Sequence, residues 1–118
     1  MKLQIKVDEN WINFKSVHIK KFNNLETDFI FLVDHKIRAT GQLRFDYSDI
    51  YMDNVEAIEK RKGYGEMLVK YLKHQKQVER ITGQSTAEAY GFWEKMKAVF
   101  NHRTFKDEGV YSFHIPCN

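Results

Sequence analysis

The sequence predicts an α+β domain with a mixed, mostly antiparallel central sheet of about six to seven strands and two main helices. Strand-like segments fill residues 2–47, and residues 49–72 then show a strand pattern, a glycine turn and a helix pattern. A further strand, helix and strand follow. A helix between two strands indicates a parallel pair joined by a crossover, so the sheet is expected to be mixed.

The first half of the chain predicts an antiparallel meander. Apolar residues alternate with polar ones from Leu3 to Val7, which is typical of a half-buried strand. Residues 34–36, Asp-His-Lys, predict a tight turn between two later strands, and Gly41 lies inside the second of them. The expected strands span residues 2–7, 11–19, 28–33 and 37–45.

The second half predicts a strand–helix–strand unit and then a second helix. A strand is expected at 50–55, and a helix from Tyr64 has apolar residues spaced along one face up to Leu72. A short strand at 77–82 precedes Ser85 and Glu88, whose spacing is that of a capping box. The apolar face of the second helix is expected to hold Ala89, Phe92, Trp93, Met96 and Phe100. After a polar loop at 101–109, a last strand is expected at 110–115.

The composition indicates one globular domain over residues 1–118. Hydrophobic residues make up 42% and charged residues 30%, and the net charge is only +3, so charge gives no argument for nucleic acid. Cys117 is the one cysteine, which excludes a disulfide within the chain and agrees with a reducing compartment. No signal-peptide pattern and no run of ~18 apolar residues is present, so we expect a cytoplasmic protein without a membrane partner.

The turn before the first helix has the features of a phosphate site. Residues 60–65 read Lys-Arg-Lys-Gly-Tyr-Gly, so two glycines and three cations lie where a helix begins. The first N–H groups of a helix have no partner within it, and the helix dipole places partial positive charge there. Glu66 after Gly65 excludes the P-loop pattern, and Leu68 stands where the dinucleotide fingerprint requires a third glycine.

Two motifs together resemble the GCN5-related N-acetyltransferase (GNAT) family. The family's acetyl-CoA loop is Gln/Arg-x-x-Gly-x-Gly/Ala, which residues 60–65 match except that Lys60 replaces Gln or Arg. A second family pattern, Asn-x-x-Ala-x-x-Phe-Tyr-Glu-Lys, is similar to residues 86–95. The family usually has two helices after its first strand, whereas no helical period is visible between Asp8 and Leu25, which indicates a reduced N-terminal half.

This resemblance implies an acetyl-CoA-dependent N-acetyltransferase. The acetyl group would pass to an amine by direct attack, without a covalent enzyme intermediate. Backbone groups of the central strand would pair with pantetheine, the loop would bind the pyrophosphate, and Lys60 or Lys62 would reach the 3′-phosphate. The cofactor-binding residues that the resemblance implies are Asn54, Val55, Lys60, Arg61, Lys62, Gly63, Tyr64, Gly65, Thr86, Phe92 and Trp93.

Asp49 is the first candidate for the catalytic base. In the histone acetyltransferase branch of the family, a glutamate lies eleven residues before the loop, and here that position is Asp49. The alternative is that Asp49 closes a turn after Ser48, as aspartate commonly does. Asp53 and Glu56 are second choices, and Asp53 shares a face with Asp49 because strand side chains alternate.

The family's usual acid is missing at its place. Its tyrosine corresponds to Trp93, whose indole N–H gives up no proton at neutral pH. Tyr90 is the first substitute and Tyr64 and Tyr111 are others, or the thiolate leaves without an acid. The alternative for Trp93 is a core or pocket-wall aromatic.

Other functional classes are weaker. The five histidines have no helical metal-ligand spacing, so no metal is expected. The alternative function is a catalytically inactive GNAT-like module that binds CoA or another protein. The acceptor amine, on a small molecule or a protein, is not identified by the sequence, and both a monomer and a homodimer stay open.

Overall fold

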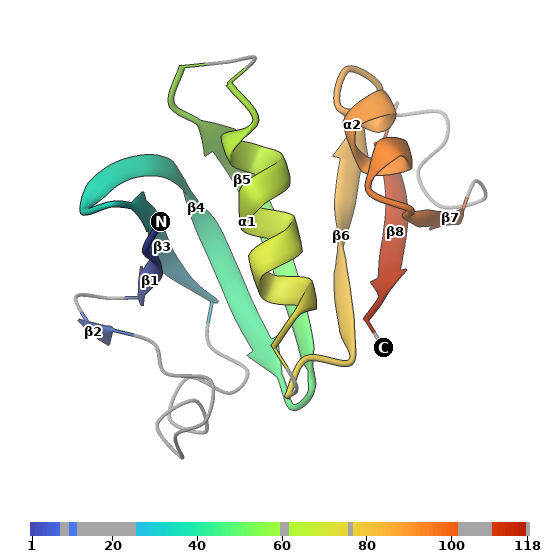
Figure 1. Ribbon diagram of the computed structural model, residues 1–118. Coiled ribbons are helices and arrows are strands. Elements are labelled where there is room, and N and C mark those ends of the chain that lie inside the picture. The colour runs from blue at the N-terminus through green and yellow to red at the C-terminus, as the bar shows by residue number, and fades with distance from the viewer. Residues whose placement is uncertain (8–9, 12–25, 60–61, 76, 102–109, 118) are drawn as a thin grey trace.

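The computed structural model describes residues 1–7, 10–11, 26–59, 62–75, 77–101 and 110–117. These residues form one sheet in the strand order β2-β1-β3-β4-β5-β6-β8-β7 and two helices (Figure 1). The elements are β1 Leu3–Val7, β2 Asn10–Trp11, β3 Glu26–Val33, β4 Lys36–Asp46, β5 Asp49–Ala57, α1 Tyr64–Lys73, β6 Arg80–Thr86, α2 Tyr90–Lys95, β7 Val99–Asn101 and β8 Val110–Pro116. The predicted α+β class is confirmed, and the short strands β2 and β7 bring the sheet to eight strands.

The sheet is mixed because one connection crosses over. Strands β5 and β6 are parallel, with α1 between them in the chain, and the other six strand pairs of the described residues are antiparallel. This confirms the predicted crossover. The tight turn between β3 and β4 is also confirmed: Asp34 and His35 have φ of 50° and 69°, as a two-residue hairpin loop requires.

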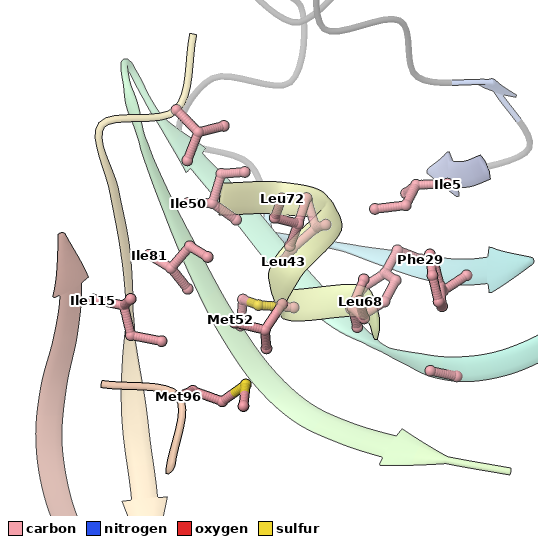
Figure 2. Packing of buried hydrophobic residues seen from close by; sticks show 14 of the residues in the cluster. Ile5, Phe29, Leu43, Ile50, Met52, Leu68, Leu72, Ile81, Met96 and Ile115 are labelled. Atoms are coloured by element: carbon pink, nitrogen blue, oxygen red, sulfur yellow. The ribbon is translucent and has the colours of Figure 1, made fainter. Parts of the chain in front are cut away.

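The core lies between the sheet and the two helices. Leu43 of β4 and Met52 of β5 point toward Leu68 and Leu72 of α1, and all four are at most 2% exposed (Figure 2). Both helices cover the same face of the sheet in Figure 1. The alternate residues of β4 and β5 form the opposite face, which is polar and which we call the polar face.

The second helix was predicted too early and too long. Ser85 is 1% exposed inside β6, where its Oγ donates to the Thr86 carbonyl, so the predicted capping box is wrong. The alternation of buried residues continues through β6 to Ser85, and pairing with β8 keeps this segment extended to Thr86. The helix then ends at Lys95, and Phe100 lies in β7 rather than on a helix face.

Several other expected boundaries differ. The strand expected at 77–82 is found at 80–86, and Asn101, expected in a loop, ends β7. The expected strand at 11–19 is described only at Trp11, and most of the expected loop at 101–109 lies outside the described residues. Neither helix has the length and hydropathy of a membrane span in the part of the chain that the structure describes.

Candidate functional site

The parallel strands β5 and β6 pair along only part of their length. Asp49 to Met52 pair with Arg80 to Gly83, and beyond this point β5 runs on to Ala57 and β6 to Thr86 without pairing with each other. Beyond this point, the backbone N–H and C=O groups on the facing edges of β5 and β6 therefore do not hydrogen-bond to each other. An extended ligand that carries amide groups can bind there as an additional strand does.

Gly83 allows the strands to come close just before they separate. A Cβ at this position would lie 2.9 Å from the Met52 carbonyl oxygen and 2.9 Å from the Phe113 ring. A larger residue would therefore push β5 away from β6 at the last paired position. The place where the pairing of β5 and β6 ends therefore depends on the absence of a side chain at Gly83.

A β-bulge on β5 lies directly after the separation. On β4 only Gly41 separates Thr40 from Gln42, whereas two residues separate their partners on β5. Those two residues are Asn54 and Val55, and Asn54 has a positive φ of 49°. A bulge bends its strand and redirects its backbone groups, so it changes the direction of the β5 backbone at the opening.

Neighbouring groups hold this bulge in place. A Cβ on Gly41 would lie 3.0 Å from the Asp53 carbonyl oxygen and 3.1 Å from Val55 Cα, so only glycine fits opposite the bulge. The Asn54 amide donates from Nδ2 to Gln42 Oε1 at 3.0 Å, and the Asn54 N–H donates to Asp53 Oδ1 at 2.9 Å. The predicted residues Asn54 and Val55 are therefore the bulge itself.

The N-terminus of α1 follows β5 and has the geometry of an anion site. Gly63 is its N-cap with φ of 80°, and its carbonyl accepts the Met67 N–H at 3.0 Å. The preceding N–H groups of the first turn, at Tyr64, Gly65 and Glu66, have no partner in the helix ladder. Gly63 is exposed, and no heavy atom of the described residues lies within 4 Å of the place that a Cβ would take. A phosphate group fits this open N-terminus, and the exposed Lys62 adds a positive charge.

Gly63 and Gly65 have different reasons to be glycine. Gly63 has the positive φ that a side chain disfavours, whereas Gly65 does not. A Cβ on Gly65 would lie 3.3 Å from the ring of Phe92 on α2. Gly65 therefore brings the start of α1 against α2. Lys60 and Arg61 of the predicted loop lie outside the described residues.

Glu66 places a carboxylate in the first turn of α1, and two lysines balance its charge. Its oxygens lie 2.9 Å from Lys70 Nζ and 3.2 Å from Lys95 Nζ of α2. The hydrogen bond from Lys70, followed by that from Lys95, lowers the pKa of Glu66. These contacts reduce the repulsion that Glu66 alone would exert on an anion at the helix start.

The three cofactor-binding residues predicted after the first helix, Thr86, Phe92 and Trp93, have different surroundings. Thr86 ends β6, and its Oγ1 accepts the Ala89 N–H at 3.2 Å. Trp93 is 6% exposed and stacks on Phe113 at 4.3 Å between ring centroids, so it is a core aromatic, as its alternative interpretation has it. Phe92 is only partly buried and packs beside Gly65 at the start of α1.

Tyr90, the predicted acid, begins α2 within an aromatic cluster. Its ring stacks on Phe100 at 4.0 Å and meets the edge of Tyr111 at 5.4 Å. Phe100 belongs to β7 and Tyr111 to β8, so this cluster lies on the side of β6 that faces away from β5. Tyr64 instead lies beneath the guanidinium of Arg38, 4.9 Å from its ring centroid.

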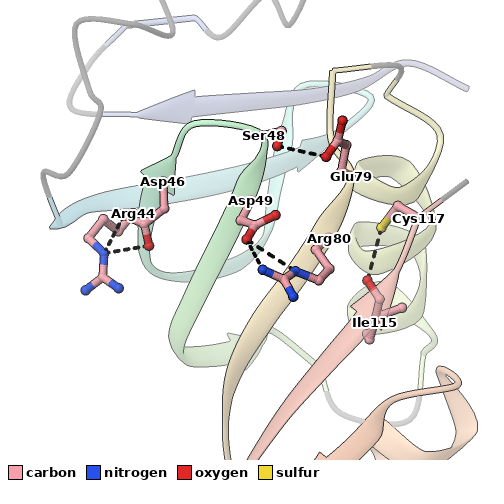
Figure 3. Close-up of polar contacts among 8 residues, drawn as sticks. All are labelled: Arg44, Asp46, Ser48, Asp49, Glu79, Arg80, Ile115 and Cys117. Carbon is pink, nitrogen blue, oxygen red and sulfur yellow. Dashed lines mark hydrogen bonds and ion pairs between the residues drawn. The ribbon is translucent and has the colours of Figure 1, made fainter.

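The candidate bases lie on the polar face. Asp49 Oδ2 lies 2.6 Å from Arg80 Nη2 on the paired part of β6 (Figure 3). Asp53 adjoins the bulge, and Tyr51 lies between these two carboxylates on the same face. Burial, and then the charge of Asp53, raises the pKa of Tyr51. The third candidate, Glu56, is exposed beyond the bulge.

Gly41, Gly83 and Arg38 were not predicted as residues of the site. Gly41 could have been recognised, because a glycine inside a strand pattern often marks a bulge. Arg38 has no local signal, since its contact with Tyr64 joins residues far apart in the chain. Among the described residues, no group of three or more His, Cys, Asp or Glu side chains is arranged to hold a metal ion.

Comparison with known proteins gives a match in structure but not in sequence. No protein-family model and no curated protein matches the chain. A Bacillus subtilis acetyltransferase solved with CoA is similar, with a TM-score of 0.59 and 12% identity over 98% of this chain and 99% of that one. The B. subtilis N-acetyltransferase YlbP, also with CoA, has a TM-score of 0.60 and 15% identity over 98% and 97% of the two chains.

A GNAT-family acetyltransferase from Elizabethkingia anophelis with acetyl-CoA bound is also similar. Its TM-score is 0.60 at 13% identity, and the match covers 97% of each chain. At this identity the likeness concerns the fold, and it extends over nearly all of both chains. The protein therefore has the fold of the GCN5-related N-acetyltransferases.

Proposed function

We propose that this protein is an N-acetyltransferase that uses acetyl-CoA as its acetyl donor. The observation that carries the proposal is the opening between β5 and β6, with a bulge at Asn54 on one side and the N-terminus of α1 beyond it. One ligand that carries both amide groups and a pyrophosphate would use both features. The presence of CoA or acetyl-CoA in similar structures supports this choice.

The chain supplies a binding group for each part of acetyl-CoA. The edge of β5 around Asn54 and Val55 would pair with the pantetheine amides. The N–H groups at the start of α1, with Lys62 beside them, would bind the pyrophosphate. Phe92 would pack on the pantetheine arm next to Gly65.

The reaction moves the acetyl group in a single displacement. The amine nitrogen forms a bond to the thioester carbon, the carbon–sulfur bond breaks, and CoA leaves as a thiolate that takes up a proton. The Val55 N–H of the bulge would stabilise the negative charge on the carbonyl oxygen. The amine must first lose a proton, because a free alkylamine is protonated at neutral pH.

We expect Asp53 rather than Asp49 to accept that proton. Asp53 adjoins the bulge, whereas the Asp49 carboxylate is held by Arg80. Asp53→Asn should lower kcat/KM about a hundredfold and remove the acid limb of the pH profile, and Asp49→Asn is the matched control. If only Asp49→Asn shows these effects, Asp49 is the base, as the spacing to the loop suggested.

A second candidate function is a CoA-binding module without catalytic activity. The observation that favours it is Trp93, a buried indole at the position of the family's tyrosine acid. Such a module would bind CoA but would transfer no acetyl group to any amine.

Thermal unfolding with and without acetyl-CoA tests the shared binding step. At about a hundred times its dissociation constant, a ligand of the folded state adds ~2.7 kcal/mol, which should raise Tm by roughly 10 °C in a domain of this size. Dephospho-CoA, tested in parallel, should give a smaller shift if a lysine of the loop binds the 3′-phosphate. An acceptor screen over polyamines, aminoglycosides and lysine peptides then separates the enzyme from the module. If no shift occurs with either ligand, both forms of the proposal fail.

A further inference from the structure

Arg38 of β4 contacts residues just before the predicted phosphate loop and Tyr64 within it. Before the loop, its carbonyl accepts the Ile58 N–H at 2.8 Å, and its Nη1 lies 3.8 Å from Glu59 Oε1. At the start of α1, its guanidinium carbon lies 4.9 Å from the centroid of the Tyr64 ring. One residue of a neighbouring strand therefore joins the end of β5 to the start of α1.

The contact with Tyr64 is the stronger of the two side-chain contacts. The Arg38 side chain is 21% exposed and that of Glu59 is 57% exposed, so water screens their ion pair. A cation above an aromatic face keeps its attraction when it is partly shielded from water. Tyr64 is the first residue of α1, so its position sets the direction of the first N–H groups.

We propose that Arg38 is a positioning residue of the cofactor site, which holds the first turn of α1 in its binding geometry. The inference rests on the proposed binding of CoA and names a residue outside the loop motif. By fixing Tyr64, Arg38 aims the N–H groups of the first turn, and its own positive charge lies near the same anion. Its loss should therefore weaken binding of the phosphate-bearing part of CoA and leave the pantetheine part unaffected.

Arg44 provides a matched control on the same strand. Its guanidinium also lies above a tyrosine, 4.7 Å from the Tyr51 centroid, and its Nε lies 3.0 Å from Asp46 Oδ1. These contacts resemble those of Arg38 in kind. They join residues of the β4–β5 hairpin on the polar face, however, and none of them involves the loop.

The test compares Arg38→Gln, Arg38→Lys and Arg44→Gln by calorimetric titration with CoA and with pantetheine, which lacks the phosphates. Arg38→Gln should weaken CoA binding about tenfold, the order of one lost cation–aromatic contact, and leave pantetheine binding unchanged. Arg38→Lys keeps the charge and should recover part of the loss. Arg44→Gln should bind both ligands as the wild type does.

Several outcomes would overturn the inference. Unchanged CoA affinity in Arg38→Gln would show that the loop does not depend on this residue. An equal loss for CoA and pantetheine, or a similar loss in Arg44→Gln, would show a general effect on the fold. If the wild type itself binds no CoA, the proposed function fails first, and the wild-type titration alone reveals it.

Discussion

Gly63→Asp tests the anion site most directly. Gly63 is exposed with φ of 80°, and a Cβ there meets no heavy atom of the described residues within 4 Å, so the new Cβ clashes with none of them. Aspartate tolerates positive φ better than most residues, and the cost in stability should be about 1 kcal/mol or less, a fall in Tm of roughly 4 °C. Its carboxylate would lie among the N–H groups that the pyrophosphate requires.

The effect on binding can be estimated from the two charges. A carboxylate about 5 Å from a phosphate repels it by ~3 kcal/mol at an effective dielectric constant of about 20, and by less where water screens the pair. We therefore expect CoA to bind ten- to a hundredfold more weakly. Gly63→Asn is the matched control, because its side chain has the same shape and the same tolerance of positive φ but no charge.

Calorimetric titration of the two Gly63 variants with CoA measures this difference, and their unfolding curves show that both are folded. The Asn variant should bind nearly as the wild type does, so that the gap between the two variants reports charge alone. Salt should narrow the gap, since exposed charges are screened. Equal affinities in the Asp and Asn variants would refute the assignment of the pyrophosphate to the start of α1.

Two further predictions concern the bulge and the link between the helices. Gly41→Ala should lower the free energy of unfolding by ~1–3 kcal/mol, because its Cβ would press on the Asp53 carbonyl oxygen at 3.0 Å. The rate of acetyl transfer should fall by a larger factor than this loss of stability explains. Gly91→Ala is its control, since no heavy atom of the described residues lies within 4 Å of a Cβ at Gly91. An unchanged Tm in Gly41→Ala would contradict the bulge geometry. Glu66→Gln should lower Tm at neutral pH but not at a pH below the folded-state pKa of Glu66. A lowered carboxyl pKa stabilises the fold above the unfolded-state pKa, and this effect is lost as the pH falls through the folded-state pKa. A Tm difference that is the same at both pH values would show that the lysine contacts add nothing.

The parts of the fold that depend on short-range patterns were predictable. The tight turn at Asp34 and His35 follows from residue types that tolerate positive φ, and the structure has it. The apolar spacing after Tyr64 predicted a helix that ends near Leu72, and α1 ends at Lys73. Both signals lie within a few residues of one another and need no knowledge of distant contacts.

The predicted start of the second helix was wrong because pairing with a strand far along the chain outweighs the local sequence pattern. Ser85 and Glu88 have the spacing of a capping box, but Ser85 lies opposite Tyr111 in the ladder between β6 and β8. Seven paired positions with β8 stabilise the extended form as far as Thr86. Thr86 then accepts the Ala89 N–H in the turn before the helix, and Ala89, the N-cap residue, makes no side-chain cap.

The position of the bulge on β5 could not be predicted from the sequence, because it depends on the register of two strands. The pattern of β5 showed Asn54 interrupting an apolar run, and that of β4 showed Gly41 inside a strand. Neither pattern says that these residues lie opposite each other. Only their pairing places a glycine opposite an asparagine and so forms the bulge.

The candidate site is built mainly from backbone groups, and this explains how little sequence it requires. Gly41 admits the bulge, Gly83 brings the strands together before they part, and Gly63 turns the chain into α1. Each of these positions matters through an absent side chain, while N–H and C=O groups common to all residues would contact the ligand. Such a site sets few demands on side chains away from these points. Proteins can therefore share this fold at 12–15% identity.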